Sequence, residues 1–135
     1  MKRFIIAAVF AGVSVTTAFA QQAAPTQPQQ PSPEQMEAAY NSARNQLGIL
    51  RYCEQNGHID GEAAEIQTKM LGMVPAPADA SAGDAAEEAG KQGKVSAMGA
   101  EQDFSASAAA QGVDEAQLCG ALANAVKQAG ANMPQ

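Results

Sequence analysis

The sequence contains no tryptophan, one histidine (His58) and only two cysteines among its 135 residues. A hydrolase that uses an activated nucleophile needs a general base beside it, and a single imidazole leaves one candidate for that role. No segment matches a nucleophile elbow or a phosphate-binding loop. We therefore expect neither enzymatic activity nor a bound cofactor.

Basic residues are also scarce. Without Lys2 and Arg3, which belong to a predicted export signal, six basic residues face fourteen acidic ones, so the formal net charge changes from −6 to −8. Nucleic acids and anionic lipids attract proteins through Lys and Arg, so we expect no nucleic-acid partner. The acidic pairs Glu87-Glu88 and Asp114-Glu115 are interpreted as solvated groups or helix starts.

The first twenty residues have the composition of an export signal. Two basic residues precede an apolar stretch over residues 4–15, and Ala18-Phe19-Ala20 fits the small-x-small rule for cleavage between Ala20 and Gln21. No later apolar run approaches the ~20 residues of a membrane-spanning helix, so we expect no stable membrane anchor. The expected product is a soluble periplasmic or secreted protein that starts with a disordered Gln/Pro-rich arm over residues 21–32.

Residues 33–135 predict a single all-α domain, a small helical bundle. Apolar residues at helical spacing, with capping boxes that start at Ser32 and Asp114, indicate where the helices lie. Helices are predicted over four segments: residues 33–56, 61–73, 95–111 and 115–129. Residues 78–93 contain no large apolar side chain and fit either a weak surface helix or a loop. No segment alternates apolar and polar residues over four or more positions, so no strand is predicted.

Cys53 and Cys119 predict one disulfide that ties the bundle together. Half of the hydrophobic residues are alanine, so the core is thin, and disulfides persist in the compartment to which an export signal leads. The bond would stabilise the fold by ~4 kcal/mol on the chain-entropy model. It would join the end of the first helix to the start of the last, which run antiparallel if they pack along their length. The natural contact between them would involve four residues: Leu47, Leu50, Leu122 and Val126. A redox-active bond and an intermolecular bond are the alternatives, and the absence of a C-x-x-C motif disfavours the first.

Weak candidates for a metal site lie near the middle of the chain. Met70 and Met73 form an M-x-x-M pair near His58, and thioether ligands suit Cu(I) outside the cytoplasm. Both methionines fall on an apolar stripe, where methionine is an ordinary gap filler, so core packing is the favoured interpretation. His58, Asp60 and Glu62 alternate through a turn but lack the ligand count of an EF-hand. We therefore predict no metal site.

Several stretches of the mature region resemble a known group of proteins. They are AYNSARNQLGIL at residues 39–50, Tyr52-Cys53, GHIDG at residues 57–61, QTKMLGM at residues 67–73 and the late Cys119. This pattern resembles small exported helical proteins of alphaproteobacteria that are labelled as the pore-forming early-secreted-antigen (WXG-type) family, although the WXG motif itself is absent. The resemblance implies a helical hairpin, a specialised secretion system and membrane lysis. It carries over no functional residue.

The leading functional hypothesis is a non-enzymatic exported protein that acts by binding a partner protein, in an adaptor, envelope-stress or chaperone-like role. A membrane-active, pore-forming helical protein is the alternative, and a periplasmic Cu(I) carrier is the third hypothesis. Neither the partner nor the oligomeric state follows from the sequence.

Overall fold

The longest helix, α1 (Pro33–Gln55), begins where its capping box predicts. In the computed structural model, which describes residues 31–97 and 100–133, Ser32 and Gln35 exchange hydrogen bonds between side chain and backbone. The helix ends before Gly57, whose φ of 72° lies in the left-handed region that favours glycine. The prediction for this helix is confirmed to within one residue. The predicted signal peptide and residues 21–30 of the predicted arm lie outside the described residues.

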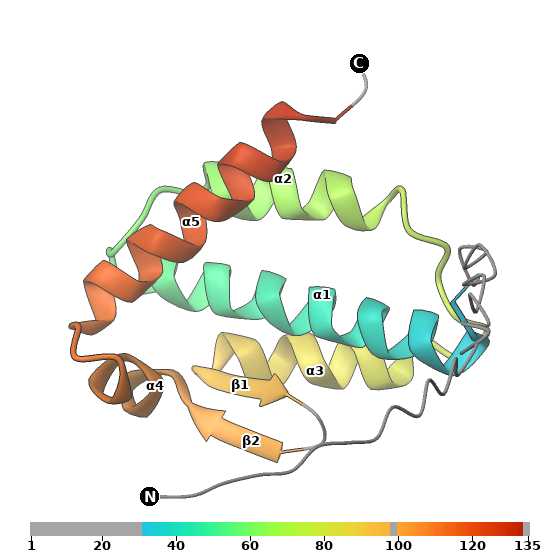
Figure 1. The fold of residues 1–135 in the computed structure, drawn as a ribbon, viewed down its shortest axis with the longest axis horizontal. Coiled ribbons are helices and arrows are strands. Elements are labelled where there is room, and N and C mark those ends of the chain that lie inside the picture. The colour runs from blue at the N-terminus through green and yellow to red at the C-terminus, as the bar shows by residue number, and fades with distance from the viewer. Residues whose placement is uncertain (1–30, 98–99, 134–135) are drawn as a thin grey trace, which may run out of the picture. The chain divides into compact units, whose positions relative to one another are not determined.

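Four further helices and one hairpin follow α1 (Figure 1). Their bounds are α2 (Glu62–Leu71), α3 (Ser81–Lys91), β1 (Lys94–Ala97), β2 (Ala100–Asp103), α4 (Phe104–Ala110) and α5 (Glu115–Ala131). The fold is therefore mostly helical, as predicted. The capping box of Asp114 and Gln117 is present at the start of α5, and α3 occupies the segment for which helix and loop were both open. The predicted helix over residues 61–73 is two residues too long at its end, because a turn begins at Gly72.

The prediction of a helix over residues 95–111 is wrong in its first half. Two strands of four residues each form an antiparallel pair there, with Lys94 opposite Asp103 and Ala97 opposite Ala100. Only residues 104–110 are helical. Strands this short cannot show a period-2 pattern, and β1 is held by the side chain of Asn45 from α1. The prediction that the chain contains no strand is therefore also wrong.

Helices α1 and α3 run parallel and approach each other closely. The contacts advance in the same direction along both helices, from Tyr40 beside Gly83 to Gly48 beside Gly90 (Figure 1). A Cβ atom on Gly48 would collide with the backbone oxygen of Glu87, and a Cβ atom on Gly90 would lie 2.8 Å from the Cα atom of Gly48. Glycine is therefore required at this crossing, since any side chain would force the helices apart.

The core has two parts that meet along α1. The first gathers Leu47, Leu50 and Val126 with residues of α2, and the second surrounds Cys53 and Cys119. Leu122 contacts both parts, so the four residues predicted to link α1 and α5 do share one core. Helix α5 nevertheless lies mainly along α2 and diverges from α1 beyond the disulfide (Figure 1).

Candidate functional site

A groove of about 360 Å³ lies where α1, β1, the start of α4 and α5 meet. Its lining comprises Ser42, Asn45, Gln46, Ile49, Val95, Ser96, Phe104 and Leu122. None of these side chains carries a charge. The walls are therefore aliphatic and aromatic, and the polar groups that face the groove are amides and hydroxyls.

Asn45 forms the buried polar floor of the groove. Its side chain is only 3% exposed, yet its Nδ2 donates to the backbone oxygens of Ala86 and Lys94, each at 2.9 Å, and its Oδ1 accepts from the Ser96 N–H at 3.0 Å. One amide thus connects α1 to α3 and to β1. Because all of these groups are hydrogen-bonded, the burial of the amide is compensated.

The same amide takes the place of a neighbouring strand for β1. The N–H of Phe104 donates to the oxygen of Gly93, and bonded and non-bonded pairs alternate along an antiparallel ladder. The backbone groups of Lys94 and Ser96 therefore face away from β2, and Asn45 bonds one group of each. This contact explains why a two-stranded hairpin is stable here, although isolated hairpins are marginal in water.

Phe104 forms one wall of the groove. Its side chain is buried, and its ring lies edge-on to that of Tyr52, with centroids 6.3 Å apart and planes at 72°. This T-shaped arrangement is favourable for aromatic pairs. Phe104 begins α4 directly after β2, so the hairpin and the helix together fix its position.

The disulfide holds the opposite walls of the groove together. The structure confirms the predicted Cys53–Cys119 bond, with Cα atoms 5.7 Å apart. Ile49 lies one helical turn before Cys53, and Leu122 lies about one turn after Cys119, so the bond aligns these two groove residues. Both cysteines are 0% exposed, which favours the structural role over a redox-active one.

The carboxylate of Glu87, predicted to be solvated, is instead buried against α1. Only 11% of its side chain is exposed, and three cations surround it: Arg44 at 3.0 Å, Lys91 at 3.3 Å and Arg51 at 3.8 Å. The sequence interpretation was wrong because the close approach at Gly48 brings this face of α3 against the basic residues of α1. Glu87 therefore compensates the charge of the α1 surface.

His58, Asp60 and Glu62 do not converge on one point. The Nε2 of His58 lies 3.8 Å from Glu115, whereas Asp60 and Glu62 bind the ammonium group of Lys127 at 3.2 and 2.6 Å. These bonds raise the pKa of Lys127, with the Glu62 hydrogen bond as the largest cause. The position that a cation would take between the two carboxylates is filled by Lys127.

Tyr52 and Glu115 form a polar contact beside the disulfide. A hydrogen bond with Glu115 is the largest cause that raises the pKa of Tyr52, and burial and the nearby carboxylates of Glu115 and Asp103 act in the same direction. The Nε2 of His58 lies 3.8 Å from the same Glu115 carboxylate. Tyr52 itself packs against the core part that surrounds Cys53 and Cys119.

The two methionines of the M-x-x-M pair have different surroundings. Met70 is half-buried against the first core part, but Met73 lies beyond the end of α2 and is 56% exposed. The expectation that both serve core packing is therefore wrong for Met73. His58 precedes α2 whereas Met70 lies in its last turn, so the helix separates the imidazole from the thioether.

Comparisons with protein-family models, curated proteins and solved structures find no match for this chain. The resemblance to the pore-forming group stays a prediction. Within residues 31–97 and 100–133, no helix is both long and apolar enough to cross a membrane. The same residues contain no group of three or more His, Cys, Asp or Glu side chains placed to hold a metal ion.

Sequence reasoning missed the groove because its lining comes from four elements. One local signal was available, since an asparagine in the middle of a long amphipathic helix competes with the helix backbone and lowers its stability. Asn45 stands two residues before the apolar Leu47, and a partner outside the helix was the natural explanation.

Proposed function

We propose that the protein is a non-enzymatic, exported helical protein that binds an apolar peptide segment of a partner in the groove between α1, β1 and α5. The observation that carries the proposal is the uncharged lining around Asn45 and Phe104. A volume of about 360 Å³ lies at the lower end of the range for ligand pockets, which suits one or two large apolar side chains. An adaptor or chaperone-like role requires this kind of recognition.

The surface charge of the protein determines which residues are favoured on either side of the bound apolar segment. Of the six basic residues in the described region, all except Lys69 form ion pairs there. Acidic residues outnumber basic ones, so the surface that remains is negative. We infer that the partner segment has apolar side chains flanked by Lys or Arg, because complementary charge raises the association rate and disfavours acidic competitors.

The chemistry of the groove supports binding rather than catalysis. Its hydroxyl groups, on Ser42 and Ser96, have no imidazole, thiol or carboxylate beside them in the lining. The imidazole of His58 lies outside the lining, 3.8 Å from Glu115. Export is supported by the sequence of the first twenty residues, and the Cys53–Cys119 bond is consistent with an oxidising compartment.

The test uses defined peptides and two matched variants. Fluorescence anisotropy measures binding of a Phe-Leu peptide flanked by lysines and of the same peptide flanked by glutamates. Ser42 lines the groove and is exposed, so Ser42→Phe fills it without changing the core, whereas Ser105→Phe places the same side chain at an exposed position of α4 outside the lining.

We expect the lysine-flanked peptide to bind the wild-type protein and to lose at least about tenfold in affinity, or ~1.4 kcal/mol, with Ser42→Phe. Ser105→Phe and wild type should bind equally. The absence of binding, or an equal loss in both variants, contradicts the proposal. Self-association instead of peptide binding, seen by sedimentation, would assign the groove to a second copy of the chain.

A further inference from the structure

The register between α2 and α5 brings methionines from both helices to the same end. Lys127 of α5 bonds Glu62 near the start of α2, and Gly130 lies so close to Ile66 that a Cβ atom on it would collide with that side chain. The contacts advance in the same direction along both helices, so the two run parallel. One turn further on, Met133 of α5 reaches the level of Met70 of α2.

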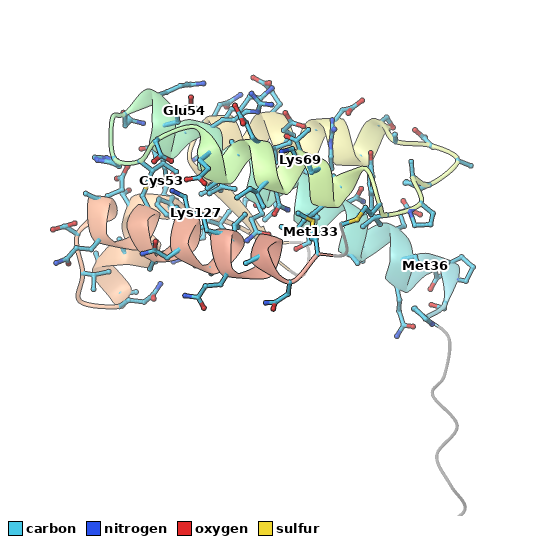
Figure 2. All side chains as sticks on the ribbon, turned by 90° about the horizontal axis from the view of Figure 1, so that it is seen from above. Met36, Cys53, Glu54, Lys69, Lys127 and Met133 are labelled. Atoms are coloured by element: carbon cyan, nitrogen blue, oxygen red, sulfur yellow. A yellow bond between two sulfur atoms is a disulfide. The ribbon has the colours of Figure 1, made fainter. Side chains whose placement is uncertain are left out.

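Met73 belongs to the same end of the molecule. Its N–H donates to the oxygen of Met70 at 3.1 Å, and the N–H of Met133 donates to the oxygen of Gly130 at the same distance. Both residues thus continue the path of their helices by one turn. Figure 2 shows Met133 at the end of α5, next to α2.

These methionines are partly accessible to solvent. Met70 and Met133 are half-buried, and Met73 is 56% exposed. A thioether that only fills a core gap is buried, and leaving an apolar side chain in water forgoes the free energy of its burial. Core packing explains the half-buried position of Met70. It does not explain why Met73 is exposed.

Because both cysteines form the disulfide, methionine thioethers are the sulfur atoms that can bind a metal ion. Both cysteines are joined to each other, so neither offers a thiolate. Neutral thioether sulfur is a soft ligand that favours Cu(I) and not the harder divalent cations, which prefer oxygen or imidazole. We propose that Met70, Met73 and Met133 bind one monovalent soft metal ion, Cu(I) in the native setting, at the open end of α2 and α5. This site lies apart from the peptide groove, to which none of its residues contributes.

The site is tested with two monovalent soft ions, Ag(I) and Cu(I). Oxidised protein with ¹³C-methyl-labelled methionine is titrated with Ag(I), and Cu(I) affinity is measured anaerobically by competition with a chromogenic chelator. We expect the methyl signals of Met70, Met73 and Met133 to shift together and to saturate at one equivalent. The signals of Met36 and the other methionines should stay in place.

Leucine variants provide matched controls, because Met and Leu exchange at nearly constant volume. Met70→Leu and Met133→Leu should each weaken Cu(I) binding at least about tenfold, the loss that even an outer-shell change causes. Met36→Leu, at an exposed methionine on α1, should leave affinity unchanged. Circular dichroism confirms that each variant is folded.

The proposal is overturned if the protein does not compete with the chelator, if all methionine signals shift alike, or if Met133→Leu binds Cu(I) as wild type does. These outcomes do not affect the peptide groove, since peptide affinity is measured separately and without metal.

Discussion

The side-chain oxygen of Asn45 accepts a hydrogen bond from the backbone N–H of Ser96, 51 residues further along the chain, at 3.0 Å. Its nitrogen bonds the oxygen of Lys94 at the same time. One amide therefore fixes the hairpin against α1 and forms the floor of the groove. The stability of the hairpin and the shape of the groove depend on the same residue.

Asn45→Asp should destabilise the protein by about 2–4 kcal/mol, because a carboxylate accepts from Ser96 but cannot donate to Ala86 or Lys94. The half-buried carbonyl oxygens of Ala86 and Lys94 would each lose this donor, and a buried charge would lack a partner. Urea unfolding followed by circular dichroism measures the change. Asn124→Asp, at an exposed position of α5, is the control and should change stability by less than about 0.5 kcal/mol. Equal effects of the two variants would contradict the role of Asn45.

Gly48→Ala should also destabilise the protein, by at least about 1–3 kcal/mol. The added Cβ atom collides with the backbone of α3, and overpacking at a rigid backbone contact forces the helices apart. Gly120→Ala is the matched control, since a Cβ atom there meets no atom within 4 Å and alanine is a better helix former by ~1 kcal/mol. The two glycine variants should therefore change the urea midpoint in opposite directions. A stabilising Gly48→Ala would show that α1 and α3 do not meet at this glycine.

Local signals were sufficient to place most helix ends. The capping boxes at Ser32 and Asp114 each involve two residues three positions apart, and they mark the starts of α1 and α5 correctly. The disulfide also followed from the sequence, because two cysteines allow one intramolecular pairing and the predicted export signal favours its formation. These features need no knowledge of how distant segments meet.

The features that the sequence did not predict depend on distant contacts. The hairpin needs Asn45, which precedes Ser96 by 51 residues, and the buried state of Glu87 needs Arg44 and the glycine crossing. The sequence of α3 consists mainly of alanine, acidic residues and glycine, so it has no apolar stripe that marks its buried face. Glycine nevertheless lets α3 approach α1 more closely than leucine would. The groove was missed for the same reason, since its four contributing elements meet only in the folded chain.

Removal of the disulfide should lower the free energy of unfolding by about 4 kcal/mol, as expected for a loop with a sequence separation of 66. Cys53→Ala with Cys119→Ala, compared with wild type in urea, measures this loss. The groove should loosen as well, because the bond aligns Ile49 and Leu122, so binding of the lysine-flanked peptide should weaken. Mass spectrometry should find the wild-type protein two hydrogens lighter than its reduced form. Free thiols at both positions would refute the pairing.

Tyr52 should make stability fall at alkaline pH. Its hydrogen bond with Glu115 raises the pKa of the folded phenol above the usual value of 10.0, so the unfolded chain releases this proton first. The stabilisation is complete below about pH 10 and is lost as the pH rises through the higher folded pKa. Lys94 and Lys127 also have raised pKa values and act in the same alkaline range, so a variant is needed to isolate the tyrosine.

Tyr52→Phe isolates the contribution of the phenol, because both lysines stay in place. Wild type should be more stable than Tyr52→Phe in urea at about pH 8, and the difference should shrink above about pH 10, where the phenol ionises. Ultraviolet titration of the phenolate gives an independent measurement, since Glu115→Gln should lower the pKa of Tyr52 by removing the charge of its partner. A stability difference that stays constant across the alkaline range would show that Tyr52 and Glu115 are not coupled, and the polar group beside the disulfide would then make only a packing contribution.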